Sequence, residues 1–270
     1  MNTQHILFFD SGVGGLPYLA SAQAALPGEH FIYAADRLHY PYGQKSVDEI
    51  RKNVLDSMAM ILNRFPVKAA VIACNTASVV ALDALRAQFS IPFVGVVPAV
   101  KPAAQLTRNN RIGVLATPQT IKNDYLTALI NDFANSCEVF RIPAPDLRDL
   151  VELHFFTATQ TEKTRIVRLA VKEIKHADVD VVVLACTHFL FTFNELQQEL
   201  GEGIHIIDSR EGVTNQLKRI LSQHRLLRPA AERRLQDPAA PLYLTGDGVV
   251  EIRYRHFAEM FHLSPVKVLA

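Results

Sequence analysis

Two segments of this chain share one pattern, in which an apolar run ends in Ala-Cys and a polar turn. They read AAVIACNTA at 69–77 and VVVLACTHF at 181–189. Each is preceded, at a similar interval, by another apolar run with a small polar turn, ILFFDSG at 6–12 and RIGVLAT at 111–117. The repetition predicts two related units built on buried strands. Chance likeness between apolar strands is the alternative.

Runs rich in β-branched and aromatic residues alternate with longer segments of helical period. This alternation predicts an α/β fold with mostly parallel sheets and helices packed on their faces. The expected strands are 6–9, 31–34, 70–73, 93–97, 112–115, 137–141, 181–184, 205–207 and 242–245. The clearest helices are 48–65, with Ser46 as N-cap, and 161–176, with an apolar stripe at Ile166, Leu169, Ala170 and Ile174.

The domain boundaries are less marked, because no Gly/Ser linker separates the halves. The Pro-containing stretch 97–102 is the best crossing point. The last predicted strand, within LYLTGDG, follows the second unit. This final part of the chain can return to the first unit. We therefore expect a first domain over 1–97 plus 209–270 and a second over 98–208.

Charge and composition favour a small-molecule ligand. Twenty-eight basic and 27 acidic residues leave a formal charge of +1, so there is no excess positive charge for nucleic acid or an anionic membrane. The chain has no signal-peptide pattern at its start and no long apolar run, which predicts a cytoplasmic protein without a membrane span. Its three cysteines are too few for a disulfide framework, and any role they have is that of a thiol.

Four polar residues follow predicted strands at the ends where open α/β sheets bind ligands. They are Asp10 and Cys74 in the first unit, and Thr117 and Cys186 in the second. If the two units face each other, these positions converge on one crevice.

The neighbours of both cysteines are short donors that can hold a carboxylate beside a thiol. They are Asn75, Thr76, Thr187 and His188. A helix that begins at each turn exposes N–H groups, which predicts a lowered pKa for both thiols. Taken alone, each cysteine has an alternative interpretation as an inert buried residue.

Two thiols in matching positions suit the inversion of an α-carbon, which needs a base on one face and an acid on the other. Asp10 and His188 can move protons for the cysteine nearer to each. A hydrolase needs one nucleophile and leaves the second cysteine unexplained. A zinc site would have only two neighbouring ligands in the sequence, Cys186 and His188, and lacks the third and fourth ligands that zinc requires.

Two loops can approach the ligand. DSGVGGL at 10–16 lacks both the lysine of a P-loop and the spacing of a dinucleotide loop, so we expect a tight turn beside a small ligand. HYPYGQKS at 39–46 is expected to be a surface loop over the crevice, with the Tyr42 hydroxyl and the Gly43 backbone as donors. A purely structural turn fits the spacing equally well.

Successive motifs resemble those of the glutamate racemases, in that family's order and over nearly the whole chain. The motifs are DSGVGGL (10–16), YPYGQKS (40–46), ACNTAS (73–78), LATPQTI (115–121), LVE (150–152) and ACTH (185–188). Aspartate and hydantoin racemases share parts of them. The resemblance implies two pseudo-symmetric α/β domains, related by a pseudo-twofold axis, with mostly parallel sheets and the active site between them. It also implies catalysis with no pyridoxal, metal or other cofactor.

The resemblance also implies a role for individual residues. It makes Cys74 and Cys186 the acid/base pair, assisted by Asp10, Glu152 and His188. The implied substrate contacts are Asp10, Ser11, Tyr42, Gly43, Asn75, Thr76, Thr120, Thr187 and His188. The expected reaction is the interconversion of L- and D-glutamate by a homodimer, which supplies D-glutamate for peptidoglycan synthesis.

The chain departs from the family pattern in places that carry no proposed catalytic group. Ala185 precedes the second cysteine where Gly is common, Phe189-Leu190 follow the histidine where Tyr/Phe-Pro is common, and VVPAV at 96–100 lacks an acidic residue. Two alternatives stay open. One is a racemase for aspartate or another amino acid, and the other is a non-catalytic amino acid binding protein that kept the cleft.

Overall fold

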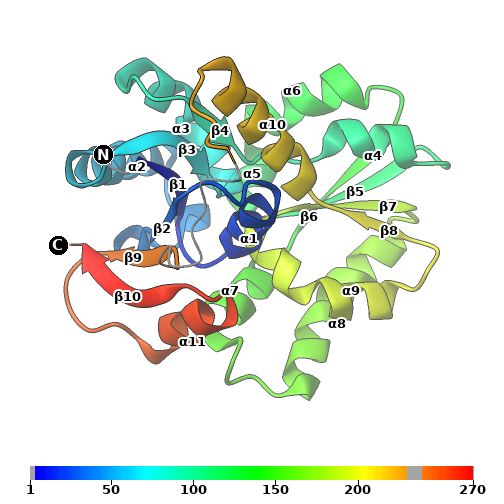
Figure 1. Ribbon diagram of the computed structural model, residues 1–270. Helices are drawn as coiled ribbons and strands as arrows, with labels where there is room; N and C mark the ends of the chain where they lie inside the picture. The colour runs from blue at the N-terminus through cyan, green and yellow to red at the C-terminus, as the bar shows by residue number, and fades with distance from the viewer. Residues whose placement is uncertain (1–3, 230–238, 270) are drawn as a thin grey trace. The chain divides into compact units, whose positions relative to one another are not determined.

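The structure is a computed structural model that describes residues 4–229 and 239–269 (Figure 1). The chain divides into two compact units, Met1–Val96 with Arg210–Ala270, and Val97–Ser209. Each unit contains one sheet, and every strand pair in both sheets is parallel. The predicted α/β class with parallel sheets is therefore confirmed.

The first unit alternates strands and helices along most of its length. Its strands are β1 (His5–Asp10), β2 (Phe31–Ala35), β3 (Val67–Ile72), β4 (Phe93–Gly95), β9 (Pro241–Thr245) and β10 (Ser264–Leu269). Its helices are α1 (Leu16–Ala25), α2 (Val47–Arg64), α3 (Asn75–Gln88), α10 (Arg210–Gln223) and α11 (Ile252–Met260), with the short 3-10 helices η1 (Arg37–His39) and η2 (Tyr42–Gln44).

The second unit has the same alternation. Its strands are β5 (Arg111–Ala116), β6 (Glu138–Pro143), β7 (Val181–Ala185) and β8 (His205–Ile207). Its helices are α4 (Val100–Leu106), α5 (Pro118–Lys122), α6 (Asp124–Phe133), α7 (Pro145–His154), α8 (Gln160–His176) and α9 (Phe193–Leu200), with the 3-10 helix η3 (Thr187–Thr192).

The two sheets share a strand order. The first sheet runs β10-β9-β2-β1-β3-β4 and the second runs β6-β5-β7-β8. In each unit the first strand is central, the second pairs on one side, and the third and fourth follow on the other. The strands before the two Ala-Cys turns, β3 and β7, therefore occupy the same place in their sheets. The sequence repeat thus corresponds to a repeat of topology.

Right-handed crossovers decide which helices cover each face of the first sheet. The connections from β2 to β3 and from β3 to β4 run in one direction, so α2 and α3 lie on the same face and pack together (Figure 1). The core on this face joins Ile50 and Met58 of α2 to Leu7 and Phe9 of β1. The connection from β1 to β2 runs the other way and places α1 on the opposite face, where it packs against α10.

The second sheet is likewise covered on two faces. α4 and α6 pack together, and Val100 and Leu126 of these helices share a core with Ile112 and Val181 of the sheet. α8 packs against α9 and α7. With apolar residues on both faces, β7 is completely buried.

Both predicted helices form, but the predicted stripe on one of them is partly wrong. Ser46 caps α2 by accepting from the Glu49 N–H, as expected. On α8 the buried positions are Val167, Ala170, Val171 and Ile174. Leu169 is 52% exposed, because a helix that buries 167, 170, 171 and 174 turns position 169 to the other side.

The strands β3 and β10 depart from expectation for reasons that the packing explains. β3 begins at Val67 and includes Lys68, whose ammonium group is buried 2.5 Å from the Glu29 carboxylate and donates to the Leu226 carbonyl at 2.6 Å. With these partners, a lysine side chain can be accommodated in a buried strand. β10 was not predicted, because it carries Pro265 and Lys267, and it lies at the sheet edge where such residues are accepted.

Among residues 4–229 and 239–269, no helix is both long enough and apolar enough to cross a bilayer.

Candidate active site

The first unit brings Asp10, Ser11 and Cys74 together at the carboxyl ends of β1 and β3. These strands are neighbours, with Phe9 opposite Ile72, so the residues that follow them meet. The Ser11 hydroxyl donates to Asp10 Oδ1 at 3.3 Å and lies 3.8 Å from Cys74 Sγ. All three side chains are buried, and Asp10 is fully so. The arrangement gives Cys74 a hydroxyl contact that leads to a buried carboxylate.

The glycine-rich turn after β1 packs tightly against the turn that carries Cys74. A Cβ atom on Gly15 would lie 2.6 Å from the Ala73 Cβ, so only glycine fits there. The Tyr33 hydroxyl holds the turn by donating to the Gly12 carbonyl and accepting from the Gly15 N–H. Gly15 thus has a structural reason to be glycine.

Asn75 and Thr76 begin α3 directly after Cys74, which is the N-cap residue. Both side chains are 3% exposed. Among residues 4–229 and 239–269, neither the Asn75 amide nitrogen nor its oxygen has a hydrogen-bond partner. A buried amide without partners costs free energy, and native proteins keep such groups mainly where a ligand or water supplies the partner.

Tyr42 differs from the expectation of an exposed loop residue. It is 1% exposed and belongs to the core that also contains Cys74. Its hydroxyl donates to Asp36, so the contact seen for that hydroxyl is internal. Gly43 follows it in η2 and is partly exposed.

The second unit brings Cys186, His188 and Glu152 together in a line. Cys186 Sγ lies 3.9 Å from His188 Nδ1, and His188 Nε2 lies 2.9 Å from Glu152 Oε2. The three side chains are buried, with Glu152 on α7 and the other two at the turn after β7. This is the geometry of a cysteine with a histidine that a carboxylate orients.

Electrostatics favour the charged form of His188. Burial is the largest single effect and lowers the pKa of this imidazole, but the hydrogen bonds to Cys186 and Glu152 and the negative charges of these two groups together outweigh it and raise the pKa to about 10. A doubly protonated ring donates from both nitrogens, toward the sulfur and toward the carboxylate. His188 can therefore supply a proton beside Cys186.

This pKa predicts a pH dependence of stability. A group whose pKa rises from 6.5 in the unfolded chain to about 10 in the folded protein stabilises fully below pH 6.5 and loses that contribution as the pH rises through 10. We expect the melting temperature of the wild type to fall between pH 7 and pH 10 by more than that of Glu152→Gln, measured by calorimetry. An equal fall in both proteins would contradict the charged dyad.

The remaining predicted residues of the second unit lie at the carboxyl ends of the neighbouring strands β5 and β7. Thr117 caps α5 by accepting from the Thr120 N–H, and the two hydroxyls lie 3.1 Å apart. Thr187 begins η3 and is 2% exposed. Within this unit the predicted strand-end residues therefore occupy one edge of the sheet, the edge that carries Cys186.

The two cysteines match in local conformation but not in the helix that follows. Cys74 has φ −136° and ψ 120°, and Cys186 has φ −142° and ψ 129°. Cys74 precedes the long helix α3, whereas Cys186 precedes the short 3-10 helix η3. A short helix exposes fewer aligned N–H groups, and at Cys186 the His188–Glu152 dyad is the stronger local feature.

One polar residue at the same sheet edge was missed. Asp36 directly follows β2, is fully buried and donates its backbone N–H to the Asp10 carbonyl at 2.7 Å. The rule that selected Asp10 and Cys74, a polar residue after a buried strand, also selects Asp36. In the part of the chain that the structure describes, no group of three or more His, Cys, Asp or Glu residues has the arrangement of a metal site.

The fold and these clusters define a two-unit α/β protein with a buried cysteine at the same topological place in each unit. A model of the family Asp/Glu/Hydantoin racemase matches residues 18–217. The chain belongs to this family, and as a member it is an isomerase.

Curated relatives and solved structures agree with this assignment. The chain is 42% identical over 221 residues to a glutamate racemase of Shewanella sp. (strain MR-7), covering 82% of this chain and 80% of that protein. It is 46% identical over 208 residues to a glutamate racemase of Klebsiella pneumoniae (strain 342), covering 76% and 72%. The Escherichia coli glutamate racemase, solved with L-glutamate and the activator UDP-MurNAc-ala, superposes with a TM-score of 0.85 at 35% identity over 99% of this chain and 98% of that one.

Proposed function

We propose that the protein interconverts L- and D-glutamate without a cofactor, with Cys74 and Cys186 as the two acid/base residues. The observation that supports this most is the pair of buried N-cap cysteines at equivalent places in two units of like topology. The similarity to glutamate racemases, including one solved with L-glutamate, supports the choice of substrate.

In the proposed reaction, each cysteine works on one face of the α-carbon. One thiolate takes the α-proton, and the other thiol gives its proton to the opposite face of the carbanion. The carbon is thereby inverted, and each cysteine ends in the state that the reverse reaction requires. Ser11 and Asp10 assist Cys74, and His188 and Glu152 assist Cys186, in keeping with their contacts.

Polar groups near the carboxyl ends of the strands are proposed to hold the amino acid. They are the side chains of Asp10, Ser11, Tyr42, Asn75, Thr76, Thr120, Thr187 and His188, and the backbone of Gly43. Asn75 is the best supported of them, because a ligand carboxylate or ammonium group would give its unpartnered amide the hydrogen bonds it lacks.

A chiral assay tests the proposed function. L-glutamate is incubated with the purified protein and no added cofactor, and D-glutamate is measured by chiral chromatography, with L-aspartate in a parallel reaction. We expect D-glutamate to accumulate to an equal mixture and D-aspartate to form far more slowly. If the protein racemised aspartate and not glutamate, aspartate would replace glutamate as the proposed substrate. Binding of glutamate without any racemisation would support a non-catalytic binding protein instead.

Asn75→Leu separates ligand binding from stability. The substitution removes an unsatisfied buried amide and replaces it with an apolar side chain of the same branched shape, so we expect the melting temperature of the free protein to stay level or rise. The loss of a hydrogen bond to a charged ligand should raise KM for glutamate about tenfold. An unchanged KM would remove Asn75 from the proposed site.

The physiological setting follows from this reaction. We propose that the enzyme works in the cytoplasm, where its thiols stay reduced, as a homodimer, and that its D-glutamate is used in peptidoglycan synthesis. Sedimentation of the purified protein tests the dimer.

A further inference from the structure

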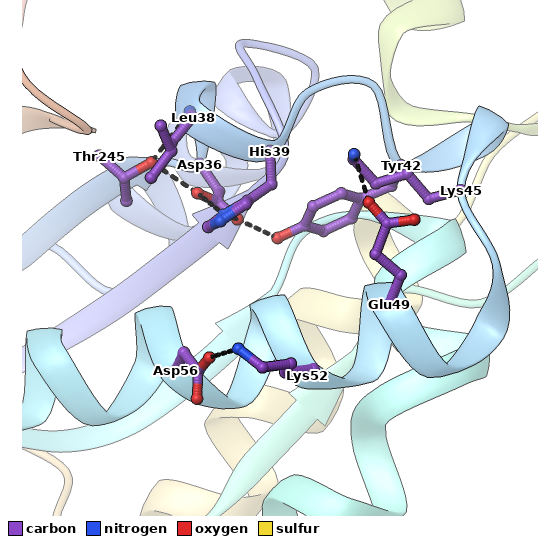
Figure 2. Close-up of polar contacts among 9 residues, drawn as sticks. All are labelled: Asp36, Leu38, His39, Tyr42, Lys45, Glu49, Lys52, Asp56 and Thr245. Carbon is purple, nitrogen blue, oxygen red and sulfur yellow. Dashed lines mark hydrogen bonds and ion pairs between the residues drawn. The ribbon is translucent and has the colours of Figure 1, made fainter.

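Asp36 is a buried carboxylate to which the proposed reaction gives no role. Its Oδ1 accepts a hydrogen bond from Thr245 Oγ1 at 2.5 Å, and its Oδ2 accepts one from the Tyr42 hydroxyl (Figure 2). The His39 Nδ1 atom lies 2.9 Å from both carboxylate oxygens. Asp36 therefore joins β9, where Thr245 lies, to the loop of residues 36–46 that carries Tyr42.

This 36–46 loop is adjacent to the cysteine of its unit. Tyr42 and Cys74 belong to one core cluster, and η2 packs against α3. Burial raises the pKa of Tyr42 well above its usual value, and the charges of Asp36, Cys74 and Asp10 raise it further. The Tyr42 hydroxyl thus stays protonated and can donate a hydrogen bond. Because Tyr42 packs in the same core as Cys74, a shift of Tyr42 would change the surroundings of Cys74.

The chain returning from the second unit holds the other end of this network. The Thr245 hydroxyl also accepts from the Leu38 N–H at 3.2 Å (Figure 2). Arg37 donates to the Asp247 carbonyl at 2.7 Å and to the Val249 carbonyl at 3.1 Å, and it pairs with Glu251. The 36–46 loop is therefore fastened to residues 245–251, far away in the sequence.

We propose that Asp36 and Thr245 are positioning residues that fix the 36–46 loop, and with it Tyr42, for substrate binding beside Cys74. The inference rests on the proposed function. A fully buried carboxylate needs its donors. Without the Thr245 hydroxyl, Asp36 turns toward other partners, and Tyr42 moves with the loop.

Protection of Cys74 from alkylation measures binding without relying on turnover. Iodoacetamide labelling of Cys74 is followed by peptide mass spectrometry at increasing glutamate concentrations, and the half-protecting concentration is recorded. The test variant is Thr245→Val, which keeps the shape and loses the hydroxyl, and Thr245→Ser restores the hydroxyl. Thr107→Val is the matched control. Thr107 also donates to a partly buried aspartate, Asp180, at 2.5 Å, but this pair lies at the amino ends of the second unit's strands, away from the ends that carry the cysteines.

We expect the half-protecting concentration to rise at least fivefold in Thr245→Val and to stay within twofold of the wild type in Thr245→Ser and Thr107→Val. An unchanged value in Thr245→Val, or equal rises in Thr245→Val and Thr107→Val, would overturn the inference. If Thr245→Val does not fold, Asp36→Asn keeps the size of the side chain, removes the charge that accepts from the Thr245 and Tyr42 hydroxyls, and must give the same rise. A wild type that glutamate does not protect would overturn the proposed function itself, and the inference with it.

Discussion

Cys74→Ser and Cys186→Ser are each expected to lower the racemisation rate about a thousandfold or more while leaving the fold intact. A serine hydroxyl is nearly isosteric with the thiol but far less acidic, so the substituted face loses its proton donor and acceptor. Because inversion needs both faces, either substitution alone should stop it. The measurement is the rate of D-glutamate formation, with circular dichroism and the melting temperature as checks on folding.

The third cysteine supplies the control for these variants. Cys137 is half-buried directly before β6 and packs against the apolar core of the second unit. Cys137→Ser should therefore keep racemisation within twofold of the wild type. Full activity in Cys74→Ser or Cys186→Ser would leave a one-base mechanism as the explanation, and the proposal would fail.

Glu152→Gln is expected to lower kcat by a factor of about 100 to 1000 with little change in KM. Glu152 lies 2.9 Å from His188 Nε2, and the other ring nitrogen of His188 lies 3.9 Å from Cys186 Sγ, so we expect Glu152 to act through the imidazole. Loss of its charge removes a partner that favours the protonated ring, and with it most of the gain from acid/base assistance.

The two directions of the reaction distinguish this role from general damage. L- and D-glutamate have equal free energies, so kcat/KM must fall by the same factor for both enantiomers. An α-deuterium isotope effect, however, should increase for only one of them, the one whose proton Cys186 removes, because only that step has been slowed. Equal increases for both enantiomers would mean that Glu152 supports the whole site and not the Cys186 side.

The fold could be predicted because it depends on patterns that are local in the sequence. Apolar runs such as 181–184 have no other stable place than a buried parallel strand, and the polar residues after them are then forced to one sheet edge. Ser46 was predictable for the same reason, since a cap acts within four residues. The repeated Ala-Cys turns indicated the like topology of the two sheets.

What could not be predicted depends on partners far apart in the sequence. Lys68 argues against a buried strand in the sequence alone, because its partners, Glu29 and the Leu226 carbonyl, are brought beside it only by the fold. The 39–46 segment has no period from which the burial of Tyr42 could be deduced. The Tyr42 hydroxyl bonds Asp36, and Asp36 is in turn held by Thr245, which lies 209 residues further along the chain.

Glu152 shows the limit of reasoning from spacing within the candidate site. It lies on α7, and its partner His188 lies after β7, so no local pattern joins them. Only the resemblance to a known family singled it out. Asp36, by contrast, was within reach, because it follows a buried strand as Asp10 does.

Solvent isotope incorporation tests the two-thiol mechanism most directly. L-glutamate is converted in deuterated water, and the first few per cent of D-glutamate and the remaining L-glutamate are examined for α-deuterium by mass spectrometry. Two cysteines on opposite faces predict fully deuterated product and undeuterated substrate, because the proton removed by one sulfur is not the one returned by the other. Product that retains the original α-proton would contradict the mechanism.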